Sequence, residues 1–425
     1  MSARPGSPRR TRSDKPSSPS PPETKGRPSR TTHGPDGRGT KRRSRTSDGK
    51  SLLTEVVLFH LFDVGRSIDL KKVAALIPTH HEFDIIKRRD TPASLSLPRP
   101  IILALGDSES VNAAEFENFS AQAKIFEEGA LVILLRVKLR IPFAELGSVR
   151  GKSVMNGDRH LSLDSWAEEA FRKTLEAIRP AIEDPQSDLS CDRESYTAYC
   201  LLESPGDPAS FVSDNRVTAA ALLIGEDHGD ELHASQVLET LAHPLSYRRD
   251  DLAIFDLDRC LIIDPRGDYE DLLLIVEHAN YQLLELRVLD KLLDRWLDEA
   301  EDEVRLFNSG RSRARKGRNR GRFAQNKLAR LQALRFDALF ILENLENSSK
   351  IIGDYYLGQI YSQLCDVFNT EGWKWSVERR LDILENVYDM VKTASSEKVI
   401  ITLEIVFIVV CVIFPILQIV QAFLL

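Results

Sequence analysis

The pattern of hydrophobic and polar positions divides the chain into four segments. Residues 1–50 contain almost no apolar side chain, residues 51–265 mix strand-like and helix-like patterns, and residues 266–398 keep a helical spacing. Residues 399–425 are almost entirely apolar. The pattern therefore predicts a disordered tail, an α+β N-terminal domain, a long-helix or coiled-coil bundle and one C-terminal transmembrane helix.

Within the α+β segment, runs that are rich in β-branched and aromatic residues predict strands. These runs cover 54–62, 100–105, 123–126, 130–139, 196–202, 217–224, 252–255 and 260–263. Amphipathic spacing predicts helices over 69–77, 163–182 and 232–241, and Asp164 is expected to be the N-cap of the second helix. A polar stretch at 183–192 is a possible break between two subdomains.

The helical segment begins near Asp268, where apolar residues recur every three to four positions from Leu272 to Trp296. This seam is typical of a coiled coil. Further helices are expected over 328–345, over 351–368 and from Trp373 onward. The helical segment is thus interpreted as a bundle, or pair of helical hairpins, that leads into the apolar C-terminal run.

The C-terminal run from 405 to 425 contains 21 residues without a charge. A helix of that length spans roughly 31 Å, which matches the hydrocarbon thickness of a bilayer. The run predicts a single-pass membrane protein whose soluble part faces the cytoplasm, at the inner membrane if the source is bacterial. A buried central helix is the less favoured alternative.

Polar residues recur along one face of this predicted anchor. Glu404, Cys411 and Gln418 are seven residues apart, and Gln421 falls near the same stripe. Polar side chains that face lipid are unfavourable, so this stripe is expected to face other copies of the helix. The interpretation is a homo-oligomer formed through stalk and anchor. The alternative is a channel or transporter subunit with a path lined by the Glu404–Gln418 face.

Charge and cysteine content refine this picture. The sequence carries a net charge of −7, but residues 1–50 hold 14 Lys or Arg against 4 Asp or Glu, a balance of +10 that leaves −17 for the remainder. The five cysteines, which are Cys191, Cys200, Cys260, Cys365 and Cys411, form no CxxC pair. A reducing compartment is therefore expected, without a disulfide framework or a structural zinc site.

The loop 310–322 is the densest charge run outside the tail. Its seven basic residues are Arg311, Arg313, Arg315, Lys316, Arg318, Arg320 and Arg322. Such a run attracts anionic lipid headgroups or an RNA backbone, and a solvated insertion without a ligand is an equally weighted alternative.

No catalytic, cofactor or metal site is predicted. The sequence from Ile254 to Leu261 resembles the first motif of haloacid-dehalogenase-type phosphatases, with Asp256 as nucleophile and Asp258 as acid or base. Cys260 occupies the usual Thr position, and a helical bundle follows where further βα units are required. A tight turn between two hairpin strands is the favoured interpretation, and a phosphatase the least favoured function.

Four stretches carry a resemblance to a known family: 67–72, 277–287, 373–384 with Glu378, Arg379 and Arg380, and Leu403–Ile405 before the apolar run. By these stretches the chain resembles the "required for meiotic nuclear division" family, as a distant, bacterial branch. The resemblance implies a membrane-anchored, oligomer-forming protein without catalytic residues, and mitochondrial members of that family support organellar translation. The function predicted from the sequence is a membrane-tethered, non-catalytic scaffold or interaction protein.

Overall fold

The computed structural model describes residues 50–77, 84–85, 100–107, 115–156, 159–186, 191–204, 206–227, 229–308, 335–336, 338–339, 343 and 354–424. The chain divides into a unit of Met1–Arg45 and a unit of Thr46–Leu425. All described residues belong to the second unit.

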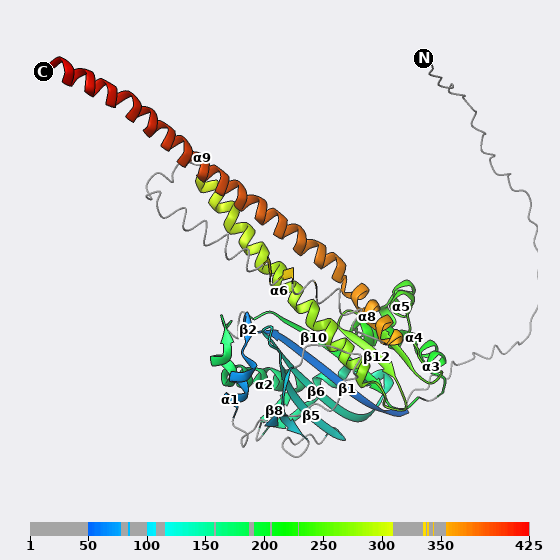
Figure 1. The fold of residues 1–425 in the computed structure, drawn as a ribbon. Helices are drawn as coiled ribbons and strands as arrows, with labels where there is room; N and C mark the ends of the chain where they lie inside the picture. Colours follow the sequence, from blue (N-terminus) through cyan, green and yellow to red (C-terminus); the bar gives the residue numbers. More distant parts are fainter. Residues whose placement is uncertain are drawn as a thin grey trace, which may run out of the picture. The chain divides into compact units, whose positions relative to one another are not determined.

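A mixed β-sheet forms the centre of this unit (Figure 1). Twelve strands are described: β1 (Ser51–Asp63), β2 (Ser67–Ile68), β3 (Asp84–Ile85), β4 (Ile101–Asp107), β5 (Asn118–Ile125), β6 (Ala130–Pro142), β7 (Ser153–Asn156), β8 (Arg159–Ser162), β9 (Ile182–Glu183), β10 (Arg193–Leu201), β11 (Leu252–Phe255) and β12 (Arg259–Ile263). Eight of them form one sheet in the order β11-β12-β10-β1-β6-β5-β4-β3. Neighbours are antiparallel except β10 and β12, which run parallel.

The described helices and 3₁₀ segments are α1 (Leu70–Leu76), η1 (Phe143–Gly151), α2 (Leu163–Ile178), η2 (Arg179–Ala181), α3 (Pro208–Asp214), α4 (Arg216–Ile224), η3 (Gly229–Glu231), α5 (Ala234–Thr240), α6 (Glu270–Asn308), α8 (Tyr355–Phe368) and α9 (Thr370–Leu424). Local capping explains several boundaries, because the carboxylates of Asp69, Asp207 and Asp354 accept hydrogen bonds from the first turns of α1, α3 and α8.

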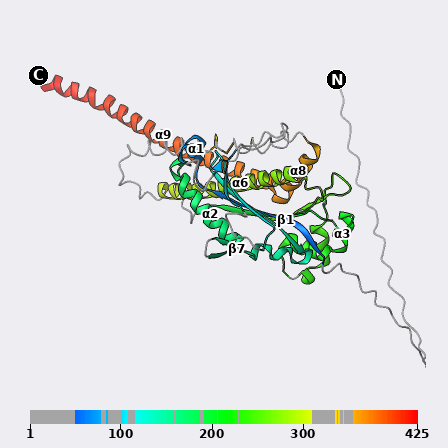
Figure 2. The ribbon, with the colours of Figure 1, turned by 90° about the horizontal axis from the view of Figure 1, so that it is seen from below.

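The sheet is covered on both faces, as the alternation along its central strand β1 requires. Val56 and Leu58 belong to the core on the face that carries α2, η1 and α4. Val57 and Phe59 belong to the core beneath α6 and α8. Because successive side chains of a strand point to opposite faces, a nearly continuous apolar run such as 56–59 is the pattern of a strand buried between two layers. Figure 2 shows the helices on either side of the strands.

Beyond the sheet, α6 continues alongside α9 as a helical stalk (Figure 1). Its core contains Leu286, Leu289 and Leu293 of α6 with Val377 and Leu384 of α9. Polar contacts flank this seam. The Ser376 hydroxyl donates to Asp290 at 3.0 Å, and the Arg380 guanidinium pairs with Asp290 and, at 3.1 Å, with Asp294.

Most of the predicted elements are confirmed, with two local corrections. Residues 217–224 are not a strand but lie in α4, and Gly225 is the C-cap of this helix, with φ +87°. The N-cap of α2 is Ser162, whose side chain accepts from the Ser165 amide, and Asp164 lies inside the first turn. Strands from both sides of 183–192 lie in one sheet, since β10 pairs with β1.

The predicted transmembrane helix is wrong. In the described part of the chain, no helix provides a stretch that is both long enough and apolar enough to cross a membrane. The apolar run is the last part of the 55-residue α9 rather than a separate element. The predicted membrane location is contradicted by the absence of such a stretch in the described helices.

Candidate interaction surfaces

A wide groove lies between α5 and α8. Its volume is about 980 Å³, and its floor includes Leu245 and Phe255. Its lining carries four carboxylates, Glu239, Asp256, Asp354 and Asp366, and none of its described lining residues is a Lys or Arg. Gly358 of α8 faces open space, because a Cβ atom placed there would meet no atom within 4 Å. The groove is therefore a concave acidic surface.

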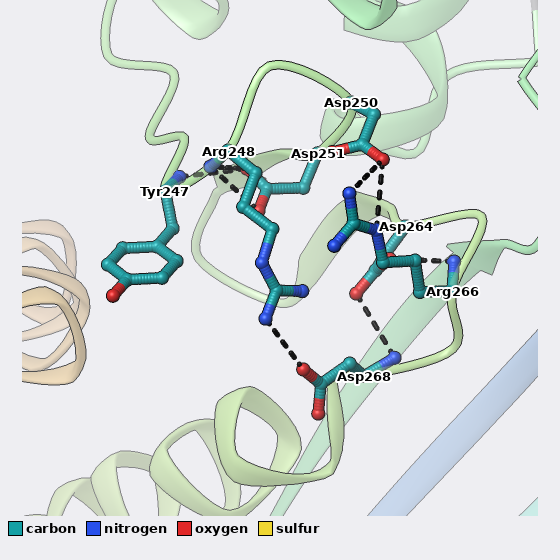
Figure 3. A network of polar contacts seen from close by, with 7 residues as sticks. All are labelled: Tyr247, Arg248, Asp250, Asp251, Asp264, Arg266 and Asp268. Carbon is teal, nitrogen blue, oxygen red and sulfur yellow. Dashed lines mark hydrogen bonds and ion pairs between the residues drawn. The ribbon is translucent and has the colours of Figure 1, made fainter.

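A polar network stands beside this groove, at the ends of β11 and β12 (Figure 3). Arg248 donates to Asp268 at 3.1 Å, and Arg266 donates to Asp250 through Nε at 3.0 Å and Nη2 at 2.9 Å. The hydrogen bond from Arg266 lowers the pKa of Asp250. These contacts join the segment before β11 to the segment between β12 and α6.

Two further carboxylates in Figure 3 organise the backbone. Asp251 accepts from the amides of Tyr247, at 2.8 Å, and Arg248, at 3.0 Å. Asp264 accepts from the amides of Arg266, at 2.9 Å, and Asp268, at 3.1 Å. Carboxylates used in this way satisfy backbone donors that no strand or helix satisfies, so the network primarily holds the two loops in place.

The Asp256–Arg259 segment is a hairpin turn, as the favoured sequence interpretation expected. The Asp256 amide donates to the Arg259 carbonyl at 2.8 Å, and the Tyr196 hydroxyl donates to the carbonyls of both residues. β11 and β12 are antiparallel, whereas the phosphatase motif follows a parallel strand. Asp256 lines the groove, and Asp258 pairs with Arg259 at 3.7 Å. Among the described residues, no three His, Cys, Asp or Glu side chains are placed to hold a metal ion.

The predicted oligomer face is described in part. Glu404 and Cys411 are exposed on α9, while the side chains of Gln418 and Gln421 lie outside the described residues. The segment from Ile405 to Val410 and Ile413 expose apolar side chains, each between 45% and 69% accessible. The basic loop, Arg311, Arg313, Arg315, Lys316, Arg318, Arg320 and Arg322, lies outside the described residues.

Buried polar contacts attach α6 to the sheet, and the sequence reading missed them. Lys124 of β5 pairs with Glu277 of α6, and both side chains are less than 10% exposed. The Tyr269 hydroxyl donates to Glu55 of β1 at 2.7 Å. The signal available in the sequence was a charged residue, Glu277, at an otherwise apolar helical position. The stretch 277–287, which carries the family resemblance, overlaps the part of α6 that packs on the sheet, from Leu273 to Leu284.

Comparisons with known proteins concern the sheet domain. Residues 54–270, from β1 to the first residue of α6, match the sequence family described as the N-terminal domain of the uncharacterized protein MJ0711. The uncharacterized protein MJ0711 of Methanocaldococcus jannaschii is 28% identical over 205 residues, which cover 48% of this chain and 59% of that relative. The chain therefore spans 59% of the length of this curated relative. No solved structure matches the chain.

Proposed function

The chain belongs to the family of the N-terminal domain of the uncharacterized protein MJ0711, and from that premise we propose that it is a non-catalytic scaffold that self-associates. Copies assemble through the C-terminal end of α9, from Ile405 to Ile413. In this assembly the sheet domain and the acidic groove remain accessible to partner proteins. The support for this proposal is the exposed apolar surface of α9 beyond its packing with α6.

The exposed side chains surround the helix. Six consecutive residues, from Ile405 to Val410, are apolar and exposed, and consecutive residues of an α-helix are about 100° apart. A helix that is apolar all round is normally buried. Full burial of one such side chain contributes about 1.5–3 kcal/mol, so a bundle of several α9 ends has a large driving force.

Cys411 makes this assembly testable, because it is an exposed free thiol within the proposed interface. In full-length protein, a short bismaleimide is expected to give a cross-linked species that the Cys411→Ser variant lacks. Light scattering is expected to give a mass that is a multiple of one chain. A Phe407→Glu, Val410→Glu variant should dissociate to monomer, because it places charges inside the bundle.

The matched control is Leu238→Glu. Leu238 is also an exposed apolar residue, 66% accessible, but it lies on α5, outside the proposed interface. This variant should keep the oligomer. A single-chain mass at every concentration together with no Cys411-dependent cross-link would refute the proposal.

Finer expectations from the sequence stay predictions. These are the narrower kinship with the "required for meiotic nuclear division" family, its bacterial branch, and contact between the basic loop 310–322 and anionic lipid or RNA. The channel alternative depended on a transmembrane helix, which none of the described helices provides. The phosphatase alternative gains no support from the hairpin geometry at Asp256.

A further inference from the structure

Four buried polar atoms without a hydrogen-bonding partner in the described part of the chain gather on one face of the sheet. The buried atoms Tyr199 Oη, Thr197 Oγ1, Arg259 Nε and His60 Nε2 find no hydrogen-bond partner in the described part of the chain. They come from β10, β12 and β1, which are adjacent strands in the sheet. Thr197 lies opposite Arg259 in the register of β10 and β12 and opposite Leu58 of β1.

All four residues lie on the face that carries α2, η1 and α4. Tyr199 and Leu58 belong to the core of that face. Thr197 is two residues from Tyr199 on β10, and His60 is two residues from Leu58 on β1, so both point to the same side. The strand order therefore brings together polar groups that are distant in the sequence.

Two guanidinium groups lie at the edge of this cluster, that of its member Arg259 and that of Arg150. Arg259 donates through Nη1 to the Leu222 carbonyl at the end of α4, at 3.2 Å, and its guanidinium lies against Gly225. A Cβ atom at Gly225 would lie 2.4 Å from Arg259 Nη2, so a larger residue there would displace the guanidinium, and φ of +87° would strain its backbone. Arg150 at the end of η1 donates to Asp164 at 3.1 Å. Both arginine side chains are partly accessible, so the cluster extends from buried hydroxyls to the surface.

The cluster contains donors and also faces two carboxylates. Asp164 lies 3.5 Å from His60 Nε2, and Asp258 lies 3.7 Å from Arg259 Nε. Burial raises the pKa of Tyr199 and Asp258 adds to that rise, while Arg259 and Arg150 oppose it. The Tyr199 phenol thus stays protonated at neutral pH and can donate. Burial lowers the pKa of His60 to about 4 although Asp164 raises it, so the imidazole is neutral at pH 7. Tyrosine and threonine hydroxyls and the arginine Nε–H are all donors.

We propose that this cluster, Thr197, Tyr199 and Arg259 with Arg150 at its outer edge, binds an oxoanion group, either a phosphate or a carboxylate. Donors that are buried without an acceptor are unfavourable, and charge-assisted hydrogen bonds to an anion are the strongest interaction that would satisfy them. Ordered water is the competing occupant, since buried water commonly satisfies such groups. Titration with anions distinguishes a bound oxoanion from ordered water.

The test uses full-length protein and thermal unfolding in titrations of phosphate, acetate and chloride at matched ionic strength. Phosphate or acetate is expected to raise the Tm saturably, and chloride is not; the more effective anion identifies the ligand chemistry. In the Thr197→Val, Tyr199→Phe variant, the affinity for that anion should fall about tenfold or more, because two donors to a charged group are lost.

The same variant also tests the cluster without ligand. Because the two hydroxyls have no partner in the described part of the chain, their removal is expected to leave the anion-free Tm unchanged or raised. Tyr196→Phe is the matched control on the opposite face of β10. It removes a hydroxyl that bonds two carbonyls, so it should lower the Tm but keep the anion response.

Two results would overturn the proposal. The first is the absence of saturable stabilisation by either phosphate or acetate, which would leave ordered water as the occupant. The second is an equal anion response in wild-type protein and in the Thr197→Val, Tyr199→Phe variant, which would place any anion elsewhere.

Discussion

The buried ion pair between Lys124 and Glu277 offers the sharpest test of how α6 is attached to the sheet. Only 8% of the lysine side chain and 6% of the glutamate side chain are exposed. Glu277→Gln keeps the shape of the side chain but removes its charge. The Lys124 ammonium group is then buried without a counter-charge, which typically costs about 3–5 kcal/mol. That is a large part of the roughly 5–15 kcal/mol that stabilises a folded domain.

The assay is urea unfolding of full-length protein, followed by circular dichroism. We expect Glu277→Gln to lower the unfolding midpoint strongly, because the Lys124 ammonium group stays buried without its counter-charge. The control is Glu169→Gln, which removes the partner of Arg159 in an ion pair whose side chains are 66% and 41% exposed. Exposed pairs contribute about 0–1 kcal/mol, so this variant should shift the midpoint little.

A double variant separates a buried charge from a change in packing. Lys124→Met with Glu277→Leu removes both charges and keeps apolar volume, and it should recover most of the stability that Glu277→Gln loses. The reasoning fails if Glu277→Gln costs less than about 1 kcal/mol, the scale of an exposed pair. It also fails if the double variant is less stable than the single one.

Three further predictions concern single residues. Burial raises the pKa of Asp63 to about 6, so the folded state holds this proton more tightly than the unfolded chain does. The protein therefore loses stability as pH rises from about 4 to 6. Asp63→Asn should flatten that part of the stability–pH profile, measured by urea unfolding. Gly129→Ala should unfold the β5–β6 turn region, visible as fast amide hydrogen exchange, because φ is +103° and a Cβ would lie 1.9 Å from the Gly65 carbonyl oxygen. Ser162→Ala should lower the unfolding free energy by about 1 kcal/mol through loss of the α2 cap, and an unchanged midpoint would argue against Ser162 as N-cap.

Strands and helices with a clear period were predictable from the sequence. The run 54–62 lies within β1, and the seam that begins at Leu272 lies within α6. The structure of the run 217–224 was not predictable, because a short apolar stretch fits a buried strand and a buried helix equally well. In the fold this run is the helix α4, which packs on the sheet and is capped by Gly225 in a conformation that favours glycine.

The same limit applied to the C-terminal run. The prediction of a membrane span depended only on the uncharged, apolar composition of residues 405–425. The finding that contradicts it is a property of the described helix, in which no stretch is both long and apolar enough. Glu404 and Cys411 are exposed on α9, and the role of their stripe in assembly stays a prediction.

The sequence by itself determined much of the local structure: most of the runs that form strands, and the position of the long helix α6. Only the tertiary structure decided which polar residues meet. Glu239 and Asp366 line one groove although they are 127 positions apart, and His60, Thr197 and Arg259 share one face through the order of β1, β10 and β12. The physical reason is that side-chain periodicity is a local property, whereas strand order and helix docking depend on contacts across the whole chain.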